Sequence, residues 1–298
     1  MDAPKLSELV DKFLQHGQVM KNYSKYTVIG YKSSLRSFLR DTGMTEVSQL
    51  NRDSVEQFFF NGRAVRKWSP VGFRYYLKHI NCFLKWLQRN NYIETNYVEG
   101  MEKPRMEHKI PRTLTHDEAN LLLDYTFHSL YRYRFERYRN RAVIAIMLMA
   151  GLRRGEVINM QYQDISIEGK TIFIHQGKGN KDRMIPINGR LSMILSEYIL
   201  ERVRLKRESP YFFISMSHDE PFGRKGIQNL VEKLRKRSKM SFSAHTLRHA
   251  FARLMLEGGC DIYTLSKIMG HSKITTTTIY LSCSGSQMSK SIEMHSLN

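Results

Sequence analysis

Apolar residues recur at helical spacing through the first hundred residues of this chain, and this periodicity is the feature that most limits its possible folds. Side chains three and four positions apart lie on one face of an α-helix. A first stripe with this spacing consists of Leu6, Leu9, Val10, Phe13 and Leu14. A second stripe consists of Val28, Tyr31, Leu35, Phe38 and Leu39. We therefore predict that residues 1–100 form a helical domain.

A further helix is predicted to begin at Ser69 and Pro70, because serine is a favourable N-cap and proline is tolerated in the first turn. Its inward face is apolar and contains Phe73, Tyr76, Leu77, Ile80, Leu84 and Leu87. Its other face is basic and contains Arg74, Lys78, Lys85 and Arg89. The stripe before it carries similarly placed Lys25, Lys32 and Arg36. Basic helix faces occur both as solvated surfaces and as phosphate-binding surfaces.

The charge of the whole chain favours the second interpretation. Its 298 residues include 47 Lys and Arg against 28 Asp and Glu, which leaves a formal net charge of +19. A folded protein with such a charge is expected to bind a polyanion, and nucleic acid is the best candidate. We therefore predict DNA contacts from Lys25, Lys32, Arg36, Arg74, Lys78 and Lys85.

Other classes of protein are disfavoured by what the sequence lacks. The longest apolar stretch, residues 142–151, is too short to span a bilayer, and the first residues lack the apolar segment of a signal peptide. Neither an amphipathic membrane anchor nor a lipidation signal is found. Cys82, Cys260 and Cys283 are odd in number and far apart, so neither a disulfide framework nor a zinc site is expected. We expect a cytoplasmic, nucleoid-associated protein that does not bind a membrane and needs neither a metal nor a cofactor.

A linker is predicted at residues 101–111, within the segment "GMEKPRMEHKIP", which has two prolines and almost no periodic apolar pattern. A second domain, residues 112–298, then opens with a capping box formed by Thr115 and Glu118. An apolar helix is expected to end at Gly151, and short β-branched runs around a Gly-rich turn predict a hairpin from Ile167 onward. Further helices are predicted at residues 191–205, 227–234, 245–257 and 262–269, the last closed by Gly270. The expected fold is mainly α with a small β-hairpin or sheet in the C-terminal domain.

Two short patterns in the first half of this second domain carry candidate functional residues. In "AGLRRGEV", Arg153 and Glu156 stand three residues apart and can share one side of a helix. In "QGKGNKDR", Lys178 stands at the tip of the predicted hairpin, between glycines that allow close approach of a ligand. A surface ion pair and a solvated turn would explain these patterns taken singly. The second does not have the spacing of a P-loop, so ATP binding is not supported.

Two more patterns lie near the C-terminus. In "SAHTLRHAF", His245 and Arg248 share one helical face. In "GHSKITTTTIY", His271 follows a helix-ending glycine, and Tyr280 comes nine residues later. A capped helix start and a half-buried aromatic residue would explain these two singly.

Taken together, the four patterns supply the groups that a metal-free attack on a phosphodiester requires. Guanidinium groups offer planar forks of donors to the charge that accumulates on the non-bridging oxygens. A tyrosine phenol becomes a good nucleophile once a histidine removes its proton or nearby cations favour the phenolate. A lysine on a mobile hairpin can protonate the departing 5′ oxygen as general acid.

The order Arg153, Lys178, His245, Arg248, His271, Tyr280 resembles that of the tyrosine recombinase family, and more narrowly its Xer and phage-integrase branch. The motifs "GLRRGEV", "GKGNKDR", "HTLRHAFA" and "MGHSKITTTTIY" carry the resemblance over residues 112–280. Residues 1–100 resemble the core-binding domain of that family. No motif position is missing.

The resemblance implies a role for each of these residues. Arg153 and Arg248 would clamp the scissile phosphate, Lys178 would be the general acid and Tyr280 the nucleophile. His245 would act as acid and base toward the phenol. His271 would hydrogen-bond a non-bridging oxygen, and Glu156 would orient the neighbouring cations.

The resemblance also implies how the protein would assemble on DNA. Its two domains would form a C-shaped clamp round the duplex, and four protomers would act on paired inverted-repeat sites through a Holliday junction. Accessory proteins are possible partners in such a system. The tail, residues 282–298, would mediate assembly. The phosphotyrosine bond would store the energy of the broken phosphodiester, so neither ATP nor metal would be needed.

Two other functions remain open from the sequence. Type IB topoisomerases use similar chemistry to relax supercoils, although the core-binding resemblance of residues 1–100 argues against one. A non-catalytic architectural DNA-binding protein could have the same fold. Within the recombinase interpretation, Lys181 competes with Lys178 for the role of general acid, because both stand on the same turn.

Overall fold

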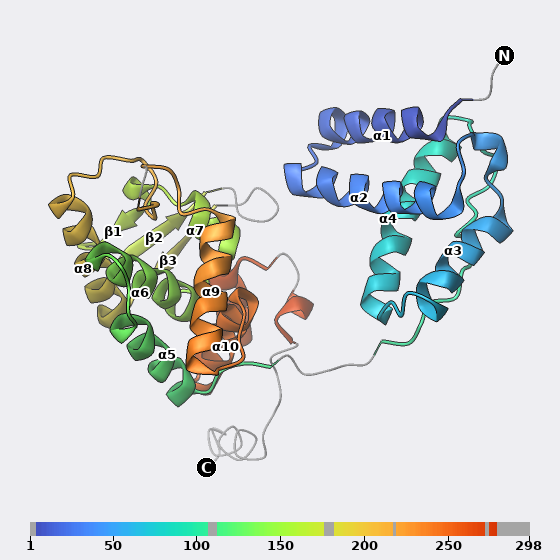
Figure 1. The fold of residues 1–298 in the computed structure, drawn as a ribbon. Coiled ribbons are helices and arrows are strands. Elements are labelled where there is room, and N and C mark those ends of the chain that lie inside the picture. Colours follow the sequence, from blue (N-terminus) through green and yellow to red (C-terminus); the bar gives the residue numbers. More distant parts are fainter. Residues whose placement is uncertain (1–3, 107–111, 176–181, 217–218, 272–273, 279–298) are drawn as a thin grey trace, which may run out of the picture. The chain divides into compact units, whose positions relative to one another are not determined.

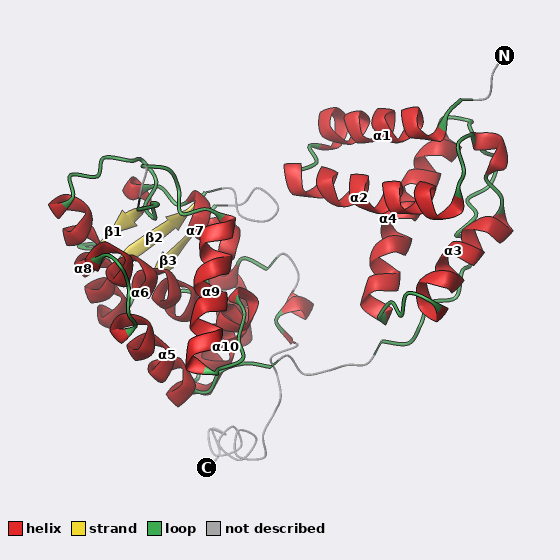
Figure 2. Cartoon of the chain, viewed as in Figure 1, coloured by secondary structure: helices red, strands yellow, loops and turns green. Residues whose placement is uncertain are grey.

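The computed structural model of the chain describes residues 4–106, 112–175, 182–216, 219–271 and 274–278. The chain divides into two compact units, Met1–His108 and Lys109–Asn298. Each unit has its own buried apolar core, and we describe each by itself. Figures 1 and 2 show the helices and strands of both units. Within the described residues, no helix is both long enough and apolar enough to cross a membrane.

The described residues of the first unit form helices joined by loops, with an isolated β-bridge between Lys5 and Glu46 (Figure 2). Its α-helices are α1 (Leu6–Lys21), α2 (Lys25–Thr42), α3 (Arg52–Ala64) and α4 (Pro70–Arg89), with a short 3₁₀ turn at Val47–Gln49. Ser24 and Ser69 act as N-caps of α2 and α4, since their side chains accept the backbone N–H of Thr27 and Gly72. The predicted start of α4 at Ser69 and Pro70 is confirmed.

The predicted apolar stripes form the core of this unit. All five residues of the first stripe are buried, and in the second Tyr31, Leu35 and Phe38 are buried while Val28 and Leu39 are partly covered. The sequence prediction did not include α3, whose Asn51 caps its start and whose buried face contains Val55, Phe58, Phe59 and Gly62. Gly62 is required there because the Trp68 ring lies where a Cβ would be.

A polar pair, Ser34 on α2 and His79 on α4, is buried within this otherwise apolar unit. Ser34 Oγ and His79 Nδ1 lie 2.7 Å apart, and His79 is 8% exposed. Burial lowers the pKa of His79 below its usual value, and the charge of neighbouring Lys78 lowers it further. The folded unit therefore holds this imidazole in its neutral form.

We expect the first unit to lose stability as the pH falls below about 6.5, the usual pKa of a histidine in an unfolded chain. The unfolded chain then binds a proton on His79 that the folded unit disfavours, so the free energy of unfolding decreases with falling pH. The slope is at most about 1.4 kcal/mol per pH unit, and the loss continues down to the lowered pKa of the folded state.

Both tryptophans of the chain, Trp68 and Trp86, belong to this unit, so their fluorescence follows its unfolding alone. In His79→Gln this contribution to the pH dependence should disappear, while every other titrating group stays in place. Equal slopes for the wild type and the variant between pH 7 and pH 5 would contradict the expectation.

The part of the second unit that the structure describes contains helices and a small sheet (Figure 2). Its α-helices are α5 (His116–His128), α6 (Arg134–Met149), α7 (Arg154–Asn159), α8 (Gly189–Arg204), α9 (Arg224–Ser238), α10 (Ala244–Glu257) and α11 (Ile262–Met269). Short 3₁₀ turns lie at Tyr162–Asp164 and Ile274–Thr276. The capping box predicted from Thr115 and Glu118 is present at the start of α5.

Helix α6 is the centre of this unit and packs against α5, α8 and α10. Every residue from Ala142 to Leu148 is buried, which explains the uninterrupted apolar run in the sequence. The helix ends at the predicted place, because Gly151 has a φ of +63° that favours glycine. The Phe251 ring of α10 lies where a Cβ of Gly151 would be, so this turn also requires the smallest residue. The turn leads directly into α7 and the site.

The predicted hairpin is part of a three-stranded antiparallel sheet in the order β1–β2–β3 (Figures 1 and 2). Its strands are β1 (Ile165–Ser166), β2 (Thr171–Ile174) and β3 (Arg183–Pro186). Ile174 pairs with Arg183 at the end of the hairpin, and Ile165 of the unpredicted β1 pairs with Ile172. The tip that contains Lys178 and Lys181 lies outside the described residues.

Candidate active site

Three arginines from different parts of the second unit meet at the C-terminal end of α11. Arg183 of β3 donates through Nε to the Ile268 carbonyl at 2.8 Å, and Arg248 of α10 donates to the Met269 carbonyl at 2.5 Å. Arg153, immediately before α7, donates to the Gly270 carbonyl at 2.8 Å. The last carbonyls of a helix lack partners within it and carry a partial negative charge, so they attract cations. We call Arg153, Arg183 and Arg248 the arginine cluster.

Glu156 of α7 is the carboxylate shared by two members of the cluster. Arg153 donates to its Oε1 at 2.8 Å, and Arg183 holds both oxygens with bonds of 2.9 and 2.8 Å. The backbone N–H of Arg153 donates to Oε2 at 2.8 Å, which fixes the start of α7. Burial acts to raise the pKa of Glu156, but Arg183 and Arg153 together lower it below its usual value. Glu156 is therefore an anion held between two cations.

Arg248 and His271 form the buried side of the site. Arg248 is 6% exposed and also donates to the Gly151 carbonyl. Its guanidinium lies 3.2 Å from Nε2 of His271, whose Nδ1 lies 2.8 Å from Oγ1 of Thr277. Because an arginine cannot accept a hydrogen bond, this contact assigns the lone pair to Nε2 and the proton to Nδ1. Thr277 is fully buried.

Helix α10 presents two histidines near Arg248. His245 is exposed, one turn before Arg248 on the helix, and His249 is half-buried. Burial lowers the pKa of His249, and the charges of His245 and Arg248 lower it further. This region of α10 therefore combines a solvent-accessible imidazole with one that stays neutral.

The structure brings together four of the residues predicted from the sequence motifs, Arg153, Glu156, Arg248 and His271. His245 lies on the same helix as Arg248 but at the surface. Lys178 and Tyr280 lie outside the described residues.

Sequence reasoning missed Arg183, although it is the last residue of the "GKGNKDR" motif. No local pattern indicates that its side chain reaches α7 and α11, because both contacts join segments that are distant in the sequence.

The basic residues predicted to contact DNA in the first unit lie at or near its surface. Lys25, Arg36, Arg74, Lys78 and Lys85 are exposed, and Lys32 is half-buried. Lys32 and Arg36 line a hollow of about 480 Å³ on α2, together with Arg40 and Tyr76. Arg74 donates to the Pro104 carbonyl at 3.1 Å. This placement is compatible with both a solvated face and a phosphate-binding face.

A groove of about 670 Å³ opens beside the arginine cluster. Arg153 and Glu156 line one part of it, and His175 lines another at the end of β2. His175 Nε2 lies 2.9 Å from Oδ1 of Asp164, a buried carboxylate. Space therefore adjoins Arg153, the member of the cluster that reaches the surface.

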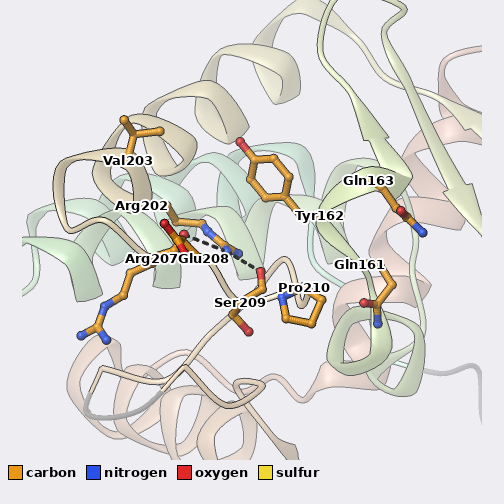
Figure 3. Close-up of a pocket in the computed structure, with 9 residues that line it drawn as sticks. All are labelled: Gln161, Tyr162, Gln163, Arg202, Val203, Arg207, Glu208, Ser209 and Pro210. Carbon is orange, nitrogen blue, oxygen red and sulfur yellow. Dashed lines mark hydrogen bonds between the residues drawn. The ribbon is translucent and has the colours of Figure 1, made fainter.

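A second cavity of about 490 Å³ lies between the end of α8 and the 3₁₀ turn at Tyr162–Asp164 (Figure 3). Its central side chain, Arg202, is 2% exposed and donates to the carbonyls of Ser209, Tyr211 and Phe212. These bonds attach the segment after α8 to the helix. Arg202 is therefore a structural arginine, in contrast to Arg153.

Comparison with known proteins places the site within a family. The model of the phage integrase family matches residues 112–285. The chain is 28% identical over 286 residues to a tyrosine recombinase of Thermosipho africanus, covering 93% of this chain and 94% of that protein. It is 26% identical over 297 residues to tyrosine recombinase XerD of Staphylococcus epidermidis, covering 96% and 97%.

Solved structures share the fold. The XerH site-specific recombinase bound to difH substrate matches with a TM-score of 0.73 and 19% identity, over 98% of this chain and 85% of that one. The Tn1549 transposon integrase in complex with a circular intermediate DNA matches with a TM-score of 0.74 and 16% identity, over 96% and 98%. The family match covers more than half of the chain and includes every member of the arginine cluster. This protein belongs to the phage integrase family of tyrosine recombinases.

Proposed function

We propose that this protein is a site-specific recombinase that cuts and rejoins double-stranded DNA through a 3′-phosphotyrosine intermediate. The observation that carries the proposal is the meeting of Arg153, Arg248 and His271 at the end of α11. These are the residues that the motifs predict to bind the scissile phosphate. Arg153 stands 117 residues before Gly270, whose carbonyl it binds, so its meeting with Arg248 and His271 is a property of the folded chain and not of neighbouring sequence.

Arg153 is well suited to bind one phosphate oxygen. Glu156 and the Gly270 carbonyl fix its guanidinium with two bonds of 2.8 Å, while the side chain keeps 24% of its surface exposed. A guanidinium has five N–H donors, so a fixed arginine at a groove can still offer a fork to a phosphate. The rigidity matters because donors already in place cost no reorganisation when charge develops in the transition state.

The proposed reaction is a transesterification. Oη of Tyr280 forms a bond to phosphorus, the P–O5′ bond breaks, and the phenolic proton passes to His245. Lys178 gives a proton to the departing 5′ oxygen, which leaves as a hydroxyl. Attack by a 5′ hydroxyl from another strand reverses these steps and rejoins the DNA. His271 would need a proton on Nε2 to donate to the phosphate, which would replace its present contact with Arg248.

The larger assembly is part of the same proposal. Residues 1–100 act as a core-binding domain, residues 101–111 as a linker and residues 112–298 as the catalytic domain, and together they close round the duplex. Four protomers act on paired inverted-repeat sites through a Holliday junction, in the cytoplasm at the nucleoid, and the tail at residues 282–298 joins neighbouring subunits. The difH-bound XerH and the DNA-bound Tn1549 integrase support a DNA partner, since their fold is shared.

A covalent-adduct assay tests the function. The protein is incubated with nicked duplexes prepared from DNA beside its gene, so that cleavage releases a short strand and traps the intermediate. We expect an adduct that survives SDS and joins the protein to a 3′ end. Relaxation of plasmids without recombinant products would instead favour a topoisomerase. Binding without any adduct would favour an architectural protein.

The general acid can be identified with a sulfur substrate. Lys178→Ala should slow cleavage of an ordinary phosphodiester by about 10²–10⁴-fold, the usual contribution of a general acid. A 5′-bridging sulfur leaves without a proton, so the variant should recover most of its rate on that substrate. The rate of adduct formation on the two substrates, measured side by side, checks this.

Lys181→Ala is the matched control, since it removes the same charge from the same turn. Its rate of adduct formation should be close to that of the wild type on both substrates. If Lys178→Ala stays slow on sulfur while Lys181→Ala is rescued there, the general acid is Lys181.

A further inference from the structure

Arg183 has no role in the chemistry proposed above, yet its side chain makes three hydrogen bonds that join β3 to α7 and α11. Its guanidinium donates to both oxygens of Glu156 at 2.9 and 2.8 Å, and its Nε donates to the Ile268 carbonyl at 2.8 Å. Only 10% of the Arg183 side chain and 9% of the Glu156 side chain are exposed. Paired, bidentate contacts of this kind are strong and fix geometry.

We propose that Arg183 is a positioning residue of the phosphate clamp, which keeps the guanidinium of Arg153 available to the DNA. The inference rests on the proposed function, because it concerns how the proposed clamp is held. Arg183 would act through Glu156 and would not itself touch the phosphate.

The physical reason is competition for one carboxylate. Glu156 now accepts two hydrogen bonds from the guanidinium of Arg183 and one from the guanidinium of Arg153. Without Arg183, Glu156 Oε2 accepts only the backbone N–H of Arg153, so both oxygens can also accept from the Arg153 guanidinium as a bidentate pair. Such a pair would turn the guanidinium toward the carboxylate and neutralise more of its charge. Arg183 therefore keeps Glu156 from capturing the cation that should bind phosphate.

The backbone at the end of α11 is built around this side chain. A Cβ on Gly270 would lie 3.0 Å from Nη1 of Arg183 and 3.2 Å from its Cδ. Gly270 also has a φ of +62°, which other residues rarely adopt. The residue whose carbonyl holds Arg153 is thus the residue that leaves room for Arg183. The positions of these two arginines are therefore coupled twice, through Glu156 and through Gly270.

The test compares Arg183→Met, Arg183→Lys and the double variant Arg183→Met/Glu156→Gln. Arg141→Met is the matched control, because Arg141 is paired with Glu197 at 2.9 Å in the same unit, away from the cluster, with 14% of its side chain exposed. We measure the rate of adduct formation at saturating protein, the affinity for DNA and the thermal unfolding midpoint. All variants are made in the full chain.

We expect Arg183→Met to lower the rate of adduct formation by about 10–100-fold, as for residues that orient functional ligands. Affinity and unfolding midpoint should change no more than in Arg141→Met. The rate of adduct formation in Arg183→Lys should lie between the rates of Arg183→Met and the wild type. Adding Glu156→Gln should restore part of the rate, since the neutral amide no longer captures Arg153 but can still accept its backbone N–H.

Two modified substrates separate positioning from other roles. A methylphosphonate at the scissile position lacks the non-bridging charge, so the deficit of Arg183→Met should shrink on it. A deficit that stays undiminished there, with no rescue by Glu156→Gln, would overturn the proposal. So would recovery on the 5′-bridging sulfur substrate, which would assign Arg183 to the general acid. Failure of the wild type to form any adduct would instead refute the proposed function.

Discussion

Tyr280→Phe should abolish formation of the covalent adduct and leave DNA binding unchanged. The substitution removes one oxygen, the atom that would form the bond to phosphorus, and keeps the ring. No other group in the proposed reaction can replace it, so the expected loss is complete rather than partial. SDS gels with a labelled nicked duplex measure the adduct, and mobility shifts with the same duplex measure binding.

A second tyrosine provides the control for this experiment. Tyr263 lies on α11, is 61% exposed, and differs from Tyr280 in having no proposed part in the reaction. Tyr263→Phe should form the adduct at the wild-type rate. An adduct that survives in Tyr280→Phe would reject Tyr280 as the nucleophile, whatever the behaviour of the control.

Replacing either clamp arginine by lysine should have the next largest effect. Arg153→Lys and Arg248→Lys should each cost about 2.7–4 kcal/mol of transition-state stabilisation, or about 10²–10³-fold in rate, by analogy with loss of one oxyanion donor. A lysine ammonium is a point charge and cannot reproduce the planar fork. At position 153, Glu156, the Gly270 carbonyl and the phosphate would also compete for the single ammonium group. The rate of adduct formation at saturating protein checks both variants.

Loss of stability has to be separated from loss of catalysis, above all for the buried Arg248. Arg202 is the matched control, since it is also buried in the second unit and also donates to main-chain carbonyls (Figure 3). Arg202→Lys should lower the thermal unfolding midpoint and keep the rate of the folded fraction. Clamp variants that recombine at nearly the wild-type rate would contradict the roles of Arg153 and Arg248.

The features that could be predicted from the sequence are those that depend on residues close together in the chain. The start of α4 at Ser69, the capping box of Thr115 and Glu118, and the end of α11 at Gly270 all follow from local rules of capping, and all are confirmed. The apolar stripe of α1 predicts its buried face for the same reason.

What was missed depends on partners distant in the sequence. Strand β1 has two residues, too few for an alternating pattern, and exists because Ile165 pairs with Ile172. Helix α3 had a usable signal in Val55, Phe58 and Phe59, but its aromatic run hides the period. Arg183 stands in a recognised motif, yet its reach to Glu156 and Ile268 is a property of the packed chain.

The acceptors that the end of α11 offers to the arginine cluster belong to the main chain, and this affects how the sequence of α11 can change in evolution. Any amino acid at positions 268 and 269 supplies a carbonyl, so mutation there tests side-chain packing and leaves the hydrogen-bonding partner of the arginine in place. The constraint that evolution must respect is the course of the backbone at one helix end. Sequence divergence in α11 is therefore compatible with an unaltered site, as long as position 270 remains glycine.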